Sequence, residues 1–373
     1  MKKSTFLILC LEGAVLSFNV AAAAALVPSI ANDFVLSQFV VGKIIWLYML
    51  PYGLAALIYG PLVRLYDARR LELICLFCFS CANLLAALAQ NIATLFAARF
   101  LMGFFGASVI PLGLILVARH IESAKRGRSV GVFFGVMFVG SLLGLFLSGV
   151  LPWRMIFLLP AIAGFVLCVA IYFYLPSFKK DTGAFKINYL YALKDKKILS
   201  VFTYIFLISL FYHGVQQWLA VYFSSRFSFS QFVISMLITL TSLSGIFGEV
   251  LGGRLSDALG RIKTVDLGII LMIISVFLLL FKLPLAILAL LMIAWGLGWT
   301  FNHAGLSTIL TDLPEEFLNE AASLNSGVRF ISGGIGAFLG GLLMQQSFKL
   351  GFIAFGACLL ALLFLSKALV LEA

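Results

Sequence analysis

Six ionisable side chains are predicted to lie well inside long apolar segments of this sequence: Glu12, Arg99, His213, Glu249, His303 and Arg329. A charged side chain in the hydrocarbon region of a bilayer costs about 3 kcal/mol or more, so each is a candidate for function. A buried carboxyl group can take up and release a proton, and a buried arginine can act as the cation of a cavity. No nucleophile with its base and acid, no metal-ligand cluster and no nucleotide-binding loop is visible. Neither an enzyme, a cofactor or metal site, nor an ATP-driven pump is therefore expected.

The segments that carry these side chains are predicted to be membrane-spanning helices. Hydrophobic residues make up 63% and charged residues 11% of the 373 residues, whereas a soluble domain has roughly 25% charged residues. About 20 helical residues cross the hydrocarbon core once. Twelve spans are predicted, at about 5–31, 41–63, 71–90, 92–118, 128–150, 153–175, 198–222, 230–252, 264–281, 284–310, 319–345 and 348–370.

The distribution of Lys and Arg predicts the orientation of these spans. The loops on the side of the two termini hold 19 of the 26 Lys and Arg residues, and the opposite loops hold 5. Cytoplasmic loops carry such an excess, so both termini are predicted to be cytoplasmic in a multi-pass protein of the cell (inner) membrane. The net charge of +11 is assigned to this topology, and no nucleic acid is expected as a partner. A signal peptide at MKKSTFLILC is the alternative, but Glu12 interrupts its apolar region.

An internal repeat divides the chain into two halves. Three glycines of the fifth span recur 196 residues later in the eleventh: Gly131, Gly140 and Gly144 correspond to Gly327, Gly336 and Gly340. Together with Gly149, the fifth-span glycines are expected to let helices pack closely. The predicted fold is an all-α membrane protein with twelve transmembrane helices in two parallel pseudo-symmetric six-helix halves, 1–175 and 198–373, joined by a cytoplasmic linker, 176–197. The six cysteines are assigned to apolar packing, not to disulfides or a metal.

Several motifs resemble those of the major facilitator superfamily. GGRLSDALGRIK (252–263) is similar to the family's loop signature between spans 8 and 9, and YGPLVRLYDARR (59–70) is its counterpart between spans 2 and 3. RFLMGFFGA (99–107) resembles the second signature, and the fifth-span glycines followed by LFLSG resemble the antiporter signature. The likeness covers nearly the whole chain and is greatest to the twelve-span drug–proton antiporter branch. Leu145, Met102 and Asn19 depart from it, since that branch has Pro, Gln and an acid there.

The resemblance implies a secondary transporter that alternates access by rocking its two halves. The acid of the loop signature is thought to lock the cytoplasmic side, so Asp257 should face the basic start of the fifth span. By symmetry Arg64 should face the start of the eleventh span, where carboxylates such as Glu315 and Glu316 lie, and we interpret this reversal as a compensated charge swap. The expected cytoplasmic-gate residues are Gly60, Arg64, Asp67, Arg69, Arg70, Glu249, Gly253, Asp257, Gly260, Arg261, Glu315 and Glu316.

Three residues are predicted to couple protons to transport: Glu12, Arg99 and Asn19. Glu12 should lie about 10 Å inside the cytoplasmic face, counted from Thr5, and Asn19 lies two turns further on the same helix face. Arg99 is predicted to lie at the same depth in the membrane as Asn19. A contact between the two side chains could therefore hold the fourth span against the first. The alternatives are that Glu12 is wetted from the cytoplasm and pairs with a base, and that Arg99 only anchors the fourth span.

A substrate cavity is expected between the halves at mid-depth. Its predicted residues are Arg329, His213, Gln216, Gln217, Trp218 and Asn325. Aromatic side chains near them could hold flat apolar or cationic molecules by stacking and cation–π contacts. The alternatives are interhelical hydrogen bonds around His213 and a structural role for Arg329.

The function predicted from the sequence is proton-coupled export of small amphipathic or apolar molecules. The expected partners are the small-molecule substrate, protons and the lipid bilayer, and the protein is expected to be monomeric. An exporter of a metabolite such as a sugar or amino acid on the same fold is one alternative. The other is a transport-dead membrane receptor or assembly partner, which would show no proton-coupled flux.

Overall fold

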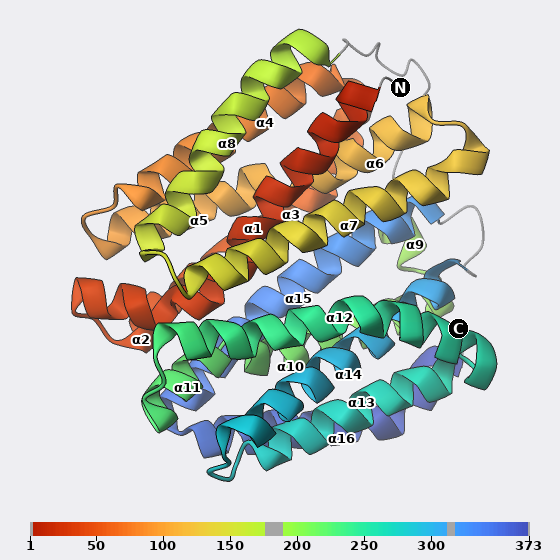
Figure 1. Cartoon of the computed structure of the whole chain (residues 1–373). Helices are drawn as coiled ribbons and strands as arrows, with labels where there is room; N and C mark the ends of the chain where they lie inside the picture. Colours follow the sequence, from red (N-terminus) through yellow and green to blue (C-terminus); the bar gives the residue numbers. More distant parts are fainter. Residues whose placement is uncertain (1–2, 176–188, 312–317, 372–373) are drawn as a thin grey trace. The chain divides into compact units, whose positions relative to one another are not determined.

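The computed structural model describes residues 3–175, 189–311 and 318–371, and their regular structure is entirely helical (Figure 1). Eleven helical segments in this part of the chain are long and apolar enough to cross a membrane. The ninth predicted span corresponds to helix α13 (Arg261–Leu278), whose first two turns hold Arg261, Lys263 and Asp266. The predicted all-α membrane architecture is therefore confirmed.

The chain separates into two compact units, and the first is Met1–Lys186. Its helices are α1 (Lys3–Phe34), α2 (Gln38–Val41), α3 (Lys43–Leu65), α4 (Ala68–Ala87), α5 (Ile92–Gly106), α6 (Val109–His120), α7 (Ser123–Ser148) and α8 (Trp153–Tyr174). The fourth predicted span is thus formed by two helices, α5 and α6, which are separated at Ala107 and Ser108.

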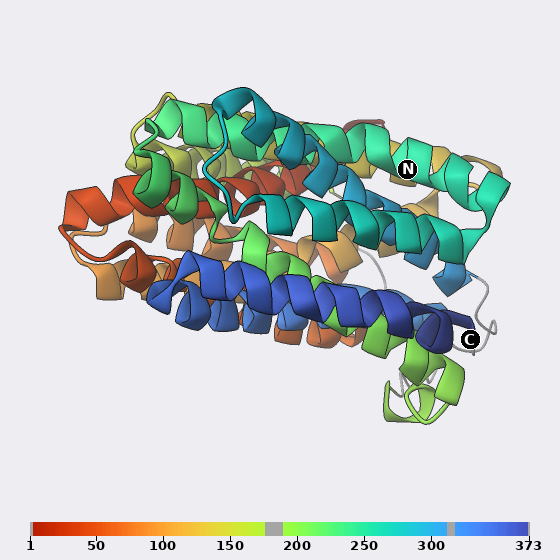
Figure 2. The ribbon, with the colours of Figure 1, turned by 90° about the horizontal axis from the view of Figure 1, so that it is seen from below.

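The second unit is Ile187–Ala373. Its helices are α9 (Tyr189–Ala192), α10 (Lys196–Gln216), α11 (Leu219–Phe227), α12 (Gln231–Leu259), α13, α14 (Leu285–Thr311), α15 (Leu318–Gln346) and α16 (Phe348–Leu371). Gln217 is the C-cap of α10, so the seventh predicted span is also divided into two helices. Helix α16 packs along α10, α13 and α15, and in Figure 2 it lies at the front in dark blue.

In the first unit, two glycines bring the backbones of α1 and α7 together along the pair of helices seen side by side in Figure 1. A Cβ atom at Gly140 would lie 2.4 Å from the carbonyl oxygen of Ala14, and one at Gly144 would lie 2.1 Å from that of Phe18. Non-bonded atoms do not approach so closely, so the crossing requires glycine at both positions.

The second unit repeats these close approaches. A Cβ atom at Gly336 on α15 would lie 2.1 Å from the carbonyl oxygen of Leu210 on α10, and one at Gly340 would lie 2.2 Å from that of Gly214. Each of these residues is 196 positions after its counterpart in the α1–α7 crossing. The repeat seen in the sequence is therefore a repeat of helix packing.

A second matched contact follows a shift of 193 residues. A Cβ atom at Gly103 on α5 would lie 2.2 Å from the carbonyl oxygen of Tyr48 on α3. In the second unit, a Cβ atom at Gly296 on α14 would lie 2.2 Å from that of Thr241 on α12. The shift of 193 residues also relates the two loop motifs, YGPLVRLYDARR (59–70) and GGRLSDALGRIK (252–263).

Of the two other glycines predicted to pack closely, Gly131 does not do so, and the packing of Gly149 stays a prediction. A Cβ atom at Gly131 would meet nothing within 4 Å, and Gly149 is the C-cap of α7 with φ −84°. Close packing of α7 therefore depends on Gly140 and Gly144. Glycine is required for another reason at Gly260, which joins α12 to α13 with φ +93°, a conformation that side chains other than glycine rarely adopt.

Side-chain caps determine where several helices begin. Asp67 was predicted as a gate residue, and its carboxylate accepts a hydrogen bond from the backbone N–H of Arg69 at 3.0 Å as the N-cap of α4. Asn91 caps α5 in the same way, and Asp195 caps α10. Such caps satisfy N–H groups that have no partner inside the helix.

We expect Gly144→Ala to lower the free energy of unfolding by about 1–3 kcal/mol, because overpacking forces the backbones apart. Gly340→Ala should cost a similar amount, since its Cβ atom would meet the carbonyl oxygen of Gly214 at 2.2 Å. The control is Gly131→Ala, which meets no atom within 4 Å and should be neutral or slightly stabilising. Thermal unfolding of the purified proteins in detergent measures the difference. Equal Tm values for Gly144→Ala and Gly131→Ala would contradict the packing argument.

Candidate functional site

A pair of buried carboxyl groups lies between α1 and α4. The side chains of Glu12 and Glu72 are 1% and 0% exposed, and their carboxyl groups interact with each other. Neither carboxyl group has a hydrogen-bond donor or a cationic partner among the other residues that the structure describes. The other titratable groups that act on Glu12 are the thiols of Cys75 on α4 and Cys168 on α8.

Two carboxyl groups in this setting cannot both be ionised. Burial removes the water that stabilises a carboxylate, and two adjacent negative charges repel each other. A protonated carboxyl group, in contrast, can donate its O–H to the neighbouring carboxylate. Burial and charge repulsion therefore favour a Glu12–Glu72 pair that shares a proton.

Glu72 is a site residue that the sequence analysis missed. It lies close to Arg69 and Arg70 at the start of the third predicted span, where the charge pattern is typical of a solvated loop. The spacing of buried residues on α4 contains the signal that could have found it, because Glu72, Phe79 and Asn83 lie on one buried face. Polar residues at helical spacing with apolar ones indicate a buried polar position.

About two turns beyond Glu12, a second polar cluster joins four helices. Nη1 of Arg99 on α5 donates to Oδ1 of Asn19 on α1 at 2.6 Å, and Nε donates to the carbonyl oxygen of Ile44 on α3 at 3.0 Å. Nδ2 of Asn19 donates to Oδ1 of Asn83 on α4 at 2.9 Å. The guanidinium group of Arg99 also lies 4.4 Å from the ring centroid of Tyr48. The cluster therefore holds α1 against α3, α4 and α5.

The structure brings Arg99 and Asn19 into direct contact, and their part in proton coupling stays a prediction. Arg99 is 1% exposed and bonds both a side chain and a backbone carbonyl, so it also anchors its helix, which was the alternative interpretation. Met102 stands where the resembled signature has Gln, and its sulfur lies 3.7 Å from Nη1 of Arg99. Asn83 was not among the predicted residues.

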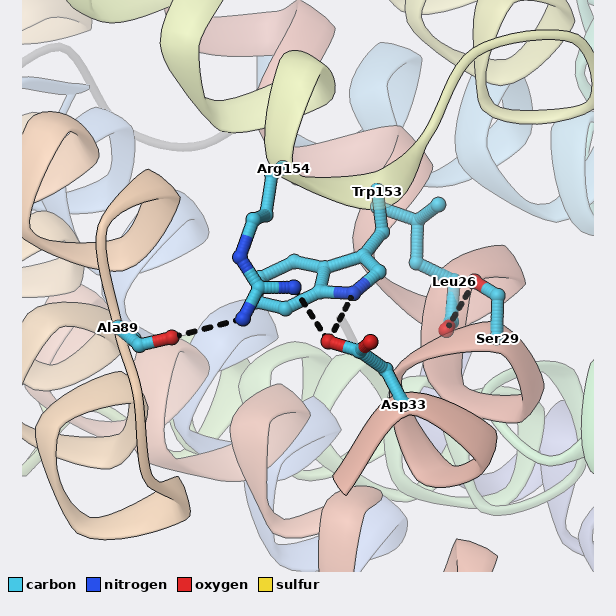
Figure 3. A network of polar contacts seen from close by, with 6 residues as sticks. All are labelled: Leu26, Ser29, Asp33, Ala89, Trp153 and Arg154. Carbon is cyan, nitrogen blue, oxygen red and sulfur yellow. Dashed lines mark hydrogen bonds and ion pairs between the residues drawn. The ribbon is translucent and has the colours of Figure 1, made fainter. Parts of the chain in front are cut away.

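At the other end of α1, Asp33 contacts two residues at the start of α8 (Figure 3). Oδ2 of Asp33 accepts hydrogen bonds from Nη1 of Arg154 and from Nε1 of Trp153, the latter at 3.2 Å. Nη2 of Arg154 donates to the carbonyl oxygen of Ala89 at 3.0 Å. These contacts join the end of α1 to the start of α8 and to the loop between α4 and α5. The side chains of Arg154 and Asp33 are 40% and 44% exposed, so solvent weakens this ion pair.

In the second unit, two of the predicted cavity residues make hydrogen bonds between helices. Nε1 of Trp295 on α14 donates to Oε1 of Gln216 at 2.7 Å, and Nε2 of Gln216 donates to Oγ1 of Thr241 on α12 at 3.4 Å. Nε1 of Trp218 donates to the carbonyl oxygen of Ala337 on α15 at 2.8 Å. Trp218 is 2% exposed. These contacts match the alternative of satisfied interhelical hydrogen bonds.

Three aromatic rings stack between α10 and α14, next to Arg329 on α15. The ring of Tyr212 lies 5.1 Å from that of Trp295 and 4.1 Å from that of Trp299, with interplanar angles of 15° and 14°. The guanidinium group of Arg329 lies 5.6 Å from the ring centroid of Trp299. Nε of Arg329 donates to Oδ1 of Asn325 at 2.7 Å. These five residues come from three helices, so the sequence alone did not show which of them are in contact.

His213 and Glu249 lie near this cluster. The ring of His213 packs edge-on against Trp299 with centroids 5.4 Å apart, and its Nδ1 lies 2.8 Å from the carbonyl oxygen of Ser209. Oε1 of Glu249 on α12 approaches Nδ1 of His303 on α14 at 2.7 Å. Glu249 was predicted as a gate residue, and the structure pairs it with His303 within the second unit.

The predicted cytoplasmic-gate residues are described only in part. Arg69 donates from Nη2 to the carbonyl oxygen of Tyr172, so it joins α4 to α8 within the first unit. A Cβ atom at Gly253 would meet nothing within 4 Å. The exposed members are Arg70, Asp257, Gly260 and Arg261. Outside the described residues and side chains lie Gly60, Arg64, Glu315 and Glu316. The compensated charge swap therefore stays a prediction.

Comparisons with known proteins agree on one family. The family model described as Major Facilitator Superfamily matches residues 9–337 and 225–372. The chain is similar to an uncharacterized MFS-type transporter of Bacillus subtilis, YbcL, with 23% identity over 86% of this chain and 84% of the relative. It is also similar to a protein of Helicobacter pylori described as a probable sugar efflux transporter, with 24% identity over 91% of this chain and 88% of the relative.

A solved structure shows the same fold. The crystal structure of the nucleoside transporter NupG matches with a TM-score of 0.80 and 14% sequence identity, and the match covers 99% of each chain.

We expect Arg99→Gln to lower the free energy of unfolding by about 2–4 kcal/mol, because it leaves buried oxygens of Asn19 and Ile44 without their donor. Arg154→Gln is the comparison, since it removes an ion pair whose side chains are 40% and 44% exposed and should cost about 1 kcal/mol or less. Thermal unfolding in detergent ranks the two variants. A larger loss in Arg154→Gln would show that the buried network does not hold the first unit together.

Proposed function

This chain belongs to the Major Facilitator Superfamily, and we propose that within this family of secondary transporters it exports small amphipathic or apolar molecules in exchange for protons. Transport would proceed by alternating access, with substrate and proton bound in turn from the two sides of the membrane. The family is not enzymatic. The observation that carries the proposal is the buried, unpartnered Glu12–Glu72 pair.

A proton-coupled carrier needs a group that holds a proton in one conformation and releases it in another. In the described conformation, both side chains are almost completely buried and have no cation beside them, which favours a bound proton. A change that admits water to the pair would stabilise the ionised form and release that proton. The pair is made by two different helices, α1 and α4, so its environment changes when either one moves.

The polar cluster around Arg99 and Asn19 connects this carboxyl pair to the other helices of the first unit. Glu12 and Asn19 are seven residues apart on α1, which is about 10 Å along the helix. Glu72 and Asn83 are both on α4, so α1 and α4 are connected through side chains at two depths. A change of charge at the carboxyl pair would alter how α1 packs against α4. Arg99 would transmit that change to α3 and α5 through its bonds to Asn19 and Ile44.

The orientation of the chain belongs to the same proposal. We place both termini on the cytoplasmic side, because the loops on that side hold most of the Lys and Arg residues. Glu12 and Glu72 lie within the first three turns of α1 and α4. They would then be near the cytoplasmic ends of these helices, where an incoming proton is released into the cell.

Export of a sugar is a second candidate, and the relative from Helicobacter pylori is the observation that favours it. The two candidate functions differ in the class of compound that should elicit proton flux. Purified protein in proteoliposomes, supplied with cationic dyes, neutral drugs, sugars and amino acids in turn, separates them when proton flux is followed with a pH-sensitive dye. Proton flux that only sugars elicit would replace the proposed substrates, and the absence of flux with every compound would contradict proton-coupled transport.

We expect Glu12→Gln and Glu72→Gln each to abolish uphill export of whichever compound elicits proton flux, while downhill exchange continues. Glutamine keeps the shape and polarity of the side chain but cannot be ionised, so it cannot bind and release a proton during transport. Transport against a concentration gradient and counterflow without a pH gradient are the two measurements. Because one shared site is lost in either variant, the double variant should be no worse than each single one.

The matched control is Glu122→Gln, which removes an exposed carboxylate that pairs with Lys125 at 2.7 Å and should transport like the wild type. Uphill transport at the wild-type rate by either buried variant would remove that carboxyl group from the coupling site. The same result for both would direct attention to Glu249.

A further inference from the structure

The side chain of Arg329 is buried and only partly bonded. It is 9% exposed, and its Nε donates to Oδ1 of Asn325 at 2.7 Å. Both terminal nitrogens, Nη1 and Nη2, are buried and have no hydrogen-bond acceptor among the residues that the structure describes. A buried guanidinium group left in this state costs free energy, because its lost hydration is not replaced. The two free nitrogens present the planar fork that binds a carboxylate through two parallel hydrogen bonds.

The carboxylate of Glu249 is close enough to act electrostatically on Arg329, but it is engaged elsewhere. Its Oε1 lies 2.7 Å from Nδ1 of His303. His213 and Tyr204 on α10 also lie within electrostatic range of Arg329. Nδ1 of His213 contacts the carbonyl oxygen of Ser209, and the Tyr204 hydroxyl donates to Asn302 at 2.7 Å. None of these groups accepts a hydrogen bond from Nη1 or Nη2.

The surroundings of the guanidinium group are aromatic. Trp299 lies beside it, with 5.6 Å between the guanidinium carbon and the ring centroid. Trp299 is partly exposed, and Tyr212 and Trp295 continue the stack behind it. Such a stack is a rigid apolar wall, and its rings can contact another flat ring at little cost in conformational entropy.

We propose that Arg329 and Trp299 form a subsite for the carboxylate of a flat aromatic monoanion. The carboxylate would accept hydrogen bonds from Nη1 and Nη2 of Arg329, and the ring of the ligand would pack against Trp299. The inference deepens the proposed function, on which it rests, by assigning the amphipathic cargo a negative charge next to an aromatic body.

The charge balance of the site selects a monoanion. Arg329 has one positive charge and no hydrogen-bond acceptor for Nη1 and Nη2 among the described residues, whereas the carboxylate of Glu249 lies against His303. A cation would be repelled by Arg329 at close range, and a dianion would bring its second negative charge close to Glu249. A neutral ring could stack on Trp299 but would leave the guanidinium group unsatisfied. One negative charge on an apolar body fits all three conditions.

The test is the binding of four small probes to the purified full-length protein, measured by isothermal titration calorimetry and by the shift in Tm. The probes are 2-naphthoate, 2-naphthamide, cyclohexanecarboxylate and 2-naphthylmethylammonium. We expect 2-naphthoate to bind about tenfold or more tightly than 2-naphthamide, since hydrogen bonds between charged groups are the strong ones. It should also bind more tightly than cyclohexanecarboxylate, and the ammonium compound should bind most weakly.

The variants assign the preference to residues. Arg329→Gln should remove the preference for 2-naphthoate over 2-naphthamide, and Trp299→Leu should remove the preference for 2-naphthoate over cyclohexanecarboxylate. Arg226→Gln is the control for partition into detergent, because it removes an arginine at the end of α11 that is remote from Arg329 in sequence. It should leave both preferences unchanged.

Equal affinity of the wild type for 2-naphthoate and 2-naphthamide would overturn the proposal, even if Arg329→Gln did not fold. An unchanged preference in Arg329→Gln would also overturn it. A third contrary result is a tenfold gain in 2-naphthoate binding by Glu249→Gln with no preference in the wild type, which would show that Glu249 is the natural partner of Arg329. All these measurements are made at equilibrium without a proton gradient, so a failure of proton-coupled export would leave them interpretable.

Discussion

Burying a polar atom without a hydrogen-bond partner costs free energy, and the polar contacts of this structure follow from that constraint. Several hydroxyl groups in the helices donate a hydrogen bond to a carbonyl oxygen of the preceding turn, as Ser80 does to Leu76 and Thr203 to Leu199. Arg99 satisfies its charge with an amide oxygen, a backbone carbonyl and an aromatic face. Among the described residues, single atoms such as the Tyr48 hydroxyl depart from this pattern, and the Glu12–Glu72 pair and Arg329 are the ionisable groups in which at least two atoms do. Because such departures are costly in a membrane, they are the positions at which we propose that a proton or a ligand binds.

The two units share a packing frame and differ in what they bury within it. The shift of 196 residues that relates the α1–α7 and α10–α15 crossings places Ile208 at the position of Glu12 and Val215 at that of Asn19. The shift of 193 residues that relates the α3–α5 and α12–α14 contacts places Met292 at the position of Arg99. All three apolar replacements are 0% exposed. The second unit thus fills with apolar side chains the positions at which the first unit has its polar network.

The same comparison holds in the other direction. Arg329 corresponds to Phe133 in the first unit, and Phe133 is 0% exposed. The same helix packing forms with an arginine at this position in one unit and a buried phenylalanine in the other, so this packing does not require the arginine. The charged residues are therefore additions that one unit carries and the other lacks. The two proposals therefore place proton binding in the first unit and ligand binding in the second, each at a group that the shared packing does not require.

The fold could be predicted from the sequence almost completely, since hydropathy and the glycine repeat depend only on local pattern. The contact of Arg99 with Asn19 followed from helical rise, because both positions could be counted from the ends of their spans. Glu72 could not be found by counting, since two arginines beside it give the pattern of a loop, and only the packing of α4 buries it. The pairing of Glu249 with His303 and the stacking of Tyr212 on Trp299 depend on side-chain directions across helices, which the sequence of one chain does not contain.

The opposite needs of the two sites determine which force would drive transport. As proposed, the carboxyl pair would take up a positive charge, and Arg329 would bind a negative one. An exchange of one inward proton for one outward monoanion moves the equivalent of two positive charges into the cell. A membrane potential that is negative inside contributes about 2.3 kcal/mol per charge per 100 mV, so this exchange gains about 4.6 kcal/mol for each 100 mV. Exchange of a proton for a neutral molecule gains half as much, and exchange for a monovalent cation gains nothing from the potential. Under this proposal Arg329 does more than select a ligand, because the charge that it selects determines how strongly the membrane potential assists export.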